Sequence, residues 1–77
     1  MYVEIWNKHV QVVGCSNCGQ EEYSFFADAR CILEGREEFG RYCPICYAWI
    51  SCADVREWLE ENEPEVLEEL RKLVGRE

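Results

Sequence analysis

The sequence predicts an α+β fold, in which a small antiparallel sheet within residues 2–52 is followed by two amphipathic helices within residues 53–77. Apolar and polar residues alternate in the first part of the chain, as is typical of strands with one buried face. After residue 52 the apolar residues recur every three or four positions, which is the helical period. Because the chain has only 77 residues, we expect residues 1–77 to form a single domain.

Residues 2–13 are predicted to form a β-hairpin with a two-residue turn at residues 7–8. This register would pair Ile5 with Val10 and Val3 with Val12 on one apolar face. Asparagine at the first turn position tolerates the positive φ that such a turn requires, although Asn-Lys is a weaker signal than Asn-Gly. The second strand would deliver the chain directly to Cys15.

The middle of the chain is predicted to contain three further short strands. Their expected positions are residues 21–26, 39–42 and 47–50, each rich in aromatic or β-branched side chains. Residues 27–38 are ambiguous, since they fit either one short helix or a strand that ends in a turn at Gly35.

The last part of the chain carries the start and stop signals of two helices. Residues 51–54, Ser-Cys-Ala-Asp, resemble a capping box, and Val55, Trp58 and Leu59 then share one helical face. Residues 62–65, Asn-Glu-Pro-Glu, stop that helix and begin a second one, with proline in its first turn. The apolar stripe of the second helix comprises Val66, Leu67, Leu70, Leu73 and Val74.

Two Cys-x-x-Cys pairs dominate the chemistry of the chain, Cys15 with Cys18 and Cys43 with Cys46. Each pair presents two thiolates on one tight turn, and two such turns brought together form a tetrahedral cage for Zn²⁺ or, less often, iron. Four cysteine ligands leave no open coordination position, so we interpret the site as structural and the protein as a non-enzyme. A chain this small has little core, and we expect it to be loose without its metal.

This arrangement resembles a zinc ribbon over residues 10–51. The resemblance rests on Cys15, Cys18, Gly19, Cys43, Pro44 and Cys46. It implies a structural metal and a platform that binds other macromolecules, for example as a regulator or accessory subunit of a transcription machine. The tail that begins at Ala53 lies outside the ribbon pattern, and Tyr47 stands where a glycine would follow the second pair.

Two other families share part of the pattern. The loops at Cys15 and Cys43 are also similar to those of rubredoxin, which would imply an Fe(Cys)4 electron carrier, although rubredoxin has glycine where Tyr47 stands. A glutaredoxin-like dithiol at Cys43 and Cys46 is the third alternative. It is disfavoured because only helical sequence follows residue 52, whereas such folds need further strands.

The charge of the chain constrains its partners. Sixteen acidic residues against eight basic ones give a formal charge of −8, and a Zn(Cys)4 centre makes it more negative still. Arg30, Arg36 and Arg41 are interleaved with acidic residues, so no basic cluster is available to bind phosphates. We therefore expect no nucleic-acid binding. We expect instead a protein partner that is basic or offers an apolar groove.

The candidate partner-binding residues lie on two elements. Tyr2, Trp6 and His9 would share the hairpin face opposite the apolar one, and Leu70 lies on the helical stripe that could mediate homo-oligomerisation. His9 is the only histidine and is interpreted as a surface side chain rather than a ligand. We also expect a cytoplasmic location, since the N-terminal residues lack the apolar core of a signal peptide and no apolar run could span a membrane.

Cys31 and Cys52 remain outside the two cysteine pairs. A free cysteine behaves as a small buried hydrophobic residue, which is the first interpretation of both. A disulfide between them, or a redox role, is the alternative.

Overall fold

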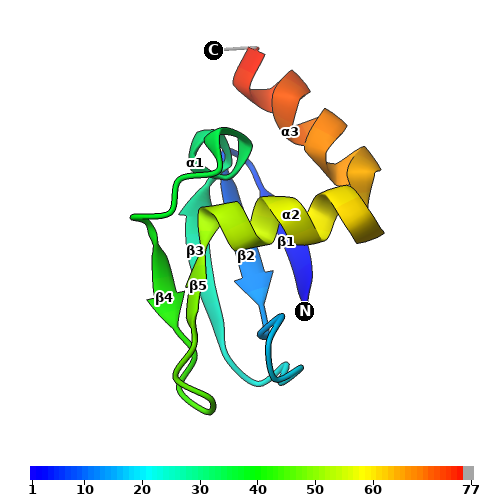
Figure 1. The fold of residues 1–77 in the computed structure, drawn as a ribbon. Helices are drawn as coiled ribbons and strands as arrows, with labels where there is room; N and C mark the ends of the chain where they lie inside the picture. The colour runs from blue at the N-terminus through cyan, green and yellow to red at the C-terminus, as the bar shows by residue number, and fades with distance from the viewer. Residues whose placement is uncertain (76–77) are drawn as a thin grey trace.

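The computed structural model describes residues 1–75, which form an α+β fold as predicted. The elements follow in the order β1 (Tyr2–Trp6), β2 (His9–Val13), β3 (Ser24–Asp28), α1 (Ala29–Glu34), β4 (Gly40–Tyr42), β5 (Trp49–Ser51), α2 (Cys52–Asn62) and α3 (Pro64–Gly75). The strands form two antiparallel sheets, and the two expected C-terminal helices are present (Figure 1). The sheet lies on one side of the molecule, with the helices in front of it and above it in this view.

The larger sheet has the strand order β1-β2-β3. The pairs Ile5–Val10 and Val3–Val12 have the predicted register, and Asn7 adopts a φ of 59° in the turn between β1 and β2. The third strand continues this pattern, because Ala27 lies beside Val10 and Phe25 beside Val12. One face of the sheet is therefore apolar from end to end.

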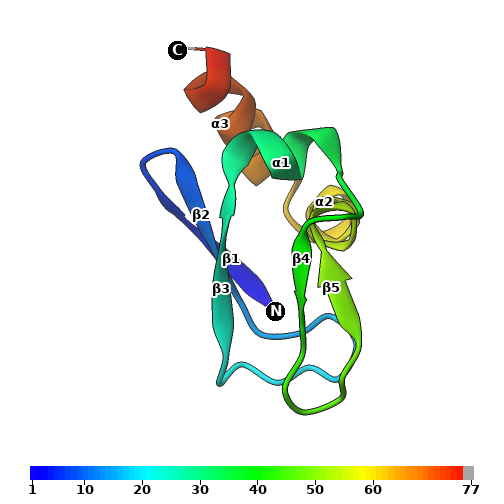
Figure 2. The same ribbon diagram turned by 90° about the vertical axis from the view of Figure 1, so that its left-hand side faces the viewer.

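The second sheet is the hairpin of β4 and β5, which stands beside β3 in Figure 2. Gly40 lies opposite Ser51 in this hairpin, and a Cβ at Gly40 would overlap the carbonyl oxygen of Ile50. The glycine thus allows the close approach of the two strands.

Helix α1 resolves the ambiguity of residues 27–38. Its N-cap is Asp28, whose carboxylate accepts a hydrogen bond of 2.8 Å from the backbone N–H of Arg30. Gly35 ends the helix in the left-handed region, with a φ of 63°. The capping box of α2 is also formed, since Ser51 and Asp54 exchange side-chain-to-backbone hydrogen bonds.

The core lies between the apolar face of the larger sheet and the three helices. Its fully buried side chains include Val10, Val12, Ile32, Val55, Leu59 and Leu70. Leu70 has no exposed surface, which corrects the expectation that it contributes to a partner-binding face. The rest of its stripe is also used internally, since Leu67 is buried and Val66, Leu73 and Val74 pack against the core. Leu70 itself therefore offers no surface to a partner, whereas self-association through the C-terminal helices stays a prediction.

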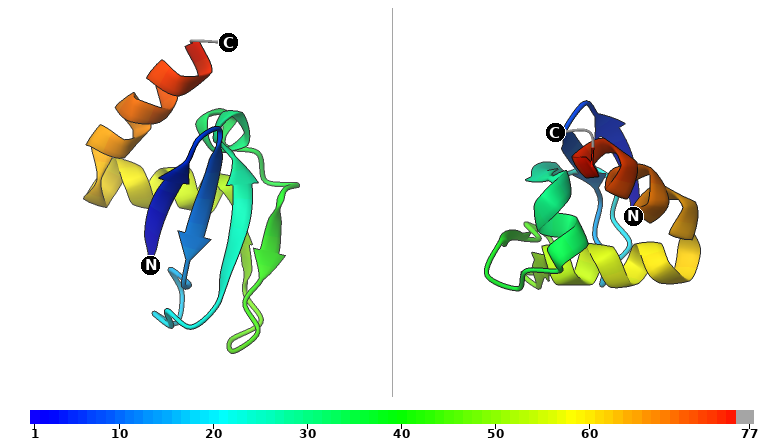
Figure 3. Two further views of the ribbon diagram at one scale, coloured as in Figure 1. Left: turned by 180° about the vertical axis from the view of Figure 1, so that it is seen from behind. Right: turned by 90° about the horizontal axis from the view of Figure 1, so that it is seen from above.

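The outer face of the larger sheet carries no helix within residues 1–75, as the view from behind shows (Figure 3). Trp6 and His9 pair on this face, and both are exposed. None of the described helices is long and apolar enough to cross a membrane.

Candidate metal centre

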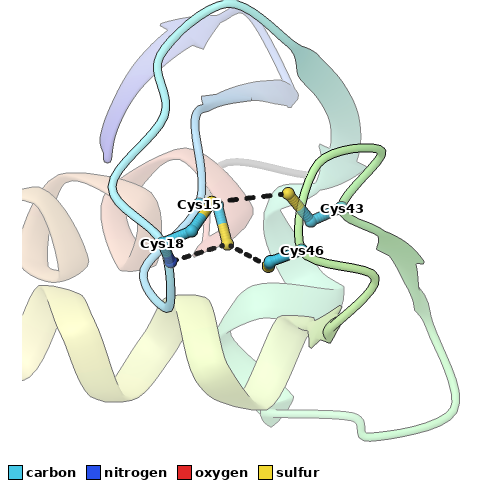
Figure 4. A group of neighbouring side chains, drawn as sticks. All are labelled: Cys15, Cys18, Cys43 and Cys46. Carbon is cyan, nitrogen blue, oxygen red and sulfur yellow. Dashed lines mark hydrogen bonds between the residues drawn. The ribbon is translucent and has the colours of Figure 1, made fainter.

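The structure brings the four paired cysteines together at the end of the molecule opposite α3 (Figures 1 and 4). Their sulfur atoms all lie within 4.8 Å of one another, and no other such group of three or more potential ligands occurs within residues 1–75. The Sγ atoms of Cys15 and Cys46 are 3.7 Å apart, as are those of Cys18 and Cys43. A tetrahedron with metal–sulfur bonds of about 2.3 Å has sulfur–sulfur edges of about 3.8 Å. The four residues therefore fit one tetrahedral metal ion.

The first cysteine turn, residues 15–20, is closed by two backbone hydrogen bonds. The N–H of Cys15 donates to the carbonyl oxygen of Gln20 at 3.0 Å, and the N–H of Gly19 donates to the carbonyl oxygen of Cys15 at 3.0 Å. Gly19 has a φ of 79°, which glycine adopts without steric cost. The turn thus places the Cys15 and Cys18 sulfur atoms on the same side of one loop.

The second turn, residues 43–48, repeats these hydrogen bonds. Cys43 N–H donates to the carbonyl oxygen of Ala48, and Tyr47 N–H donates to that of Cys43, each at 2.9 Å. Tyr47 has a φ of 62°, so it adopts the left-handed conformation that Gly19 adopts in the first turn. Tyrosine instead of glycine at position 47 therefore raises the conformational free energy of the turn but leaves its shape unchanged.

Amide groups surround the sulfur atoms. The backbone N–H groups of Asn17 and Cys18 lie 3.3 and 3.5 Å from Cys15 Sγ. Side-chain amides add to these, with Asn17 Nδ2 at 3.5 Å from Cys46 Sγ and Gln20 Nε2 at 3.7 Å from Cys43 Sγ. Donors of this kind stabilise the net negative charge of a metal ion bound by four thiolates.

The same amides shift the acidity of the thiols. Backbone hydrogen bonds, first from Cys46, lower the pKa of Cys43 to about 6 against the effect of burial. The Asn17 side chain, followed by the backbone of Ala48, lowers the pKa of Cys46. For Cys18 the backbone hydrogen bond from Gln20 is outweighed by burial and by the other three thiols, which raise its pKa to about 11. The metal-free site therefore keeps a proton on Cys18 at neutral pH.

We expect Zn²⁺ uptake at neutral pH to release at least one proton per metal ion. Zinc binds thiolates, and Cys18 with a pKa of about 11 must lose its proton, whereas Cys43 with a pKa of about 6 is already ionised. The affinity for Zn²⁺ should rise with pH between about pH 6 and pH 11, and it should fall more steeply below pH 6. Calorimetric titrations in buffers of different ionisation enthalpy measure the proton release directly. Equal binding heats in all buffers would contradict the prediction.

The metal-binding turns also explain why two strands begin later than expected. Gln20 Oε1 accepts the N–H groups of Glu22 and Tyr23, so these residues close the first loop and β3 begins only at Ser24. In the second loop the turn extends to Ala48, so β5 begins at Trp49. Local strand propensity indicated residues 21–26 and 47–50 because it takes no account of the loop geometry that the two cysteine turns adopt.

The other predicted site residues lie away from the metal centre. Tyr2, Trp6 and His9 are exposed on the outer face of the sheet, and Trp6 has 58% of its surface exposed. Phe26, 63% exposed, lies on the same face because it pairs with Gln11 on β2. Sequence reasoning missed Phe26 as a member of this face. Successive residues of a strand point to opposite faces, so a core-facing Phe25 would have placed Phe26 on the outer face.

Comparisons with protein-family models, curated proteins and solved structures give no significant match for this chain. The resemblance to a zinc ribbon therefore rests on the four cysteines, their hydrogen-bonded turns and the short hairpins that hold them.

Proposed function

We propose that this protein is a zinc-binding, non-enzymatic module that binds a protein partner through the outer face of its β1-β2-β3 sheet. The observation that carries the proposal is the exposed aromatic pair on that face. Trp6 and Phe26 line an open depression of about 400 Å³ together with His9 and Gln11. Aromatic side chains exposed together in this way mark protein–protein interaction sites.

The charge around the aromatic pair indicates the kind of partner. Glu4 and Asp28 lie on the same face, and the chain as a whole carries a formal charge of −8. A partner with an apolar side chain for the depression and basic residues at its rim would complement this surface. The resemblance to zinc ribbons extends the proposal to a regulator or accessory subunit of a larger machine, transcription being one example.

Zinc suits the role of the metal centre in this proposal. Four thiolates complete its coordination sphere, so the metal would hold the two cysteine turns together without offering a position to a substrate. Cys15 and Cys43 also belong to the buried core, which joins the metal centre to the rest of the fold. The metal would thereby stabilise the sheet that presents Trp6.

An Fe(Cys)4 electron carrier is the second candidate function. It is supported by the two equivalent turns and by the amide donors to sulfur, which are the features that tune the potential of an iron–thiolate site. Tyrosine at position 47, where rubredoxin has glycine, is only a weak objection to iron, because the Tyr47 backbone adopts the left-handed conformation expected of that glycine.

Metal analysis of protein purified from its native cell distinguishes the two candidates. We expect one Zn²⁺ per chain and no absorption in the visible range, because Zn²⁺ is a d¹⁰ ion. Stoichiometric iron with visible thiolate-to-iron absorption would overturn the zinc assignment and favour the electron carrier.

We expect the double variant Trp6→Ala/Phe26→Ala to lose a partner that co-purifies from the native cell while it keeps its fold and metal. Both side chains are largely exposed, so their removal should cost little stability. Tyr47→Gly is the matched control. It removes another exposed aromatic side chain, at a position where the φ of 62° suits glycine. Quantitative mass spectrometry of the captured proteins measures the result, and unchanged capture by the double variant would refute the proposed face.

A further inference from the structure

A second pair of thiols lies away from the metal centre. Cys31 is on α1 and Cys52 is the first residue of α2, and Cys31 is close enough to Cys52 to help raise the pKa of the Cys52 thiol. Both line one cleft of about 410 Å³ between β3, α1 and the start of α2. Helices α1 and α2 pack against each other, so the fold itself brings the two cysteines into the same cleft. Two free thiols that line one open cleft and lie close to each other are candidates for a disulfide bond.

The two thiols differ in accessibility. Cys31 is partly exposed, whereas Cys52 has only 1% of its surface exposed and belongs to the core. The N–H of Cys52 donates to the carbonyl oxygen of Phe39 at 2.9 Å, which holds the start of α2 against the wall of the cleft. A reagent in the cleft therefore meets Cys31 more readily than Cys52.

The cleft offers both apolar and charged contacts to a small molecule. Phe25, Phe26 and Phe39 provide apolar walls, and Phe39 is 51% exposed. Two acidic side chains, Asp28 and Glu34, and two basic ones, Arg30 and Arg36, line the cleft. Their formal charges cancel, whereas the whole chain has a formal charge of −8. A small anionic molecule would meet less repulsion here than the charge of the whole chain suggests.

We propose that Cys31 and Cys52 form a redox-active dithiol, independent of the four-cysteine centre, that reduces small-molecule disulfides of the glutathione type. In the first step the Cys31 thiolate attacks one sulfur of the small disulfide. The Cys31–sulfur bond forms, the small disulfide's own bond breaks, and one small thiolate leaves and takes up a proton from water.

In the second step Cys52 loses its proton to solvent and its sulfur attacks Cys31 Sγ. The bond between Cys52 and Cys31 forms, the bond between Cys31 and the small-molecule sulfur breaks, and the second small thiolate leaves and takes up a proton from water. The two protein thiols are oxidised and one small-molecule disulfide is reduced to two thiols, so atoms and electrons balance. Burial, followed by the contact with Cys31, raises the pKa of the Cys52 thiol to about 12, so this second step should accelerate as the pH rises.

The test exposes the metal-loaded full chain to glutathione disulfide at mildly alkaline pH and follows it by native mass spectrometry. We expect the wild type to lose the mass of two hydrogen atoms while it keeps its metal, and peptide mapping to find a Cys31–Cys52 bond. A wild type that stays unchanged, that keeps an unresolved glutathionyl group, or that loses metal while both thiols remain reduced would overturn the proposal.

Two variants test the order of the steps. Cys52→Ala should hold one glutathionyl group on Cys31, because the resolving thiol is absent, and alanine fits the buried position of Cys52. Cys31→Ser should acquire neither a glutathionyl group nor a disulfide, because Cys52 is shielded. Equal modification of Cys52 in Cys31→Ser, or no adduct in a folded, metal-loaded Cys52→Ala, would contradict the assigned roles.

Discussion

Cys43→Ser should unfold the domain. A structural zinc site contributes on the order of 10–16 kcal/mol that exists only in the folded protein. A core of this size supplies only about 3–5 kcal/mol. The substitution removes one ligand and places a hydroxyl in a buried position that is 4% exposed. The loss of stabilising free energy therefore exceeds what the remaining core contacts supply. Cys18→Ser should unfold the domain in the same way.

Circular dichroism and metal analysis of the purified variant measure this effect. Cys31→Ser is the matched control, since it changes another cysteine that is not a metal ligand in the proposed centre. It should cost only about 1–3 kcal/mol and leave the metal bound. A Cys43→Ser protein that keeps a cooperative thermal transition would show that the core, and not the metal, stabilises this fold.

Leu70→Asp should also unfold the chain, because Leu70 has no exposed surface and lies in the core with Leu59 and Leu67. Truncation of a buried leucine to alanine costs about 2–5 kcal/mol. Aspartate adds the cost of a buried charge without a partner, so the total exceeds the stability expected for a domain of this size.

The neighbouring substitution Glu69→Ala is the control, because Glu69 is exposed on the same helix and should leave stability nearly unchanged. Denaturant titrations of both variants, together with sedimentation of the wild type, measure the result. A folded Leu70→Asp protein that has lost only a self-association step would show that the α3 stripe is an interface, contrary to its buried position here.

The features that the sequence alone predicted correctly depend on local chemistry. The α+β class, the register of the first hairpin and the capping box of α2 follow from alternation, turn residues and a short capping motif. The clustering of the four paired cysteines also belongs to this group. Each cysteine turn is complete within six residues, and it closes through its own backbone hydrogen bonds.

The start of β3 and the backbone conformation of Tyr47 depend on the geometry of the two cysteine turns. Ser24 begins β3 only after Gln20 has bound the amides of Glu22 and Tyr23, and Tyr47 adopts a left-handed conformation that its side chain does not favour. Both features arise because the two cysteine turns, which residues 21–42 separate in the sequence, meet at one point. Local propensity contains no information about that constraint.

The tertiary structure also decided which apolar surfaces are covered. The Leu70 stripe and the Trp6 face are both apolar patterns in the sequence, and periodicity predicts each face without saying what packs against it. The helices fold over the inner face of the sheet, so Leu70 is buried and Trp6 remains exposed. The shared cleft of Cys31 and Cys52 arises in the same way, because it requires α1 to pack against α2. The sequence determined the two cysteine turns and the amphipathic elements, whereas the long-range packing of helices on one side of the sheet decided which side chains remain exposed.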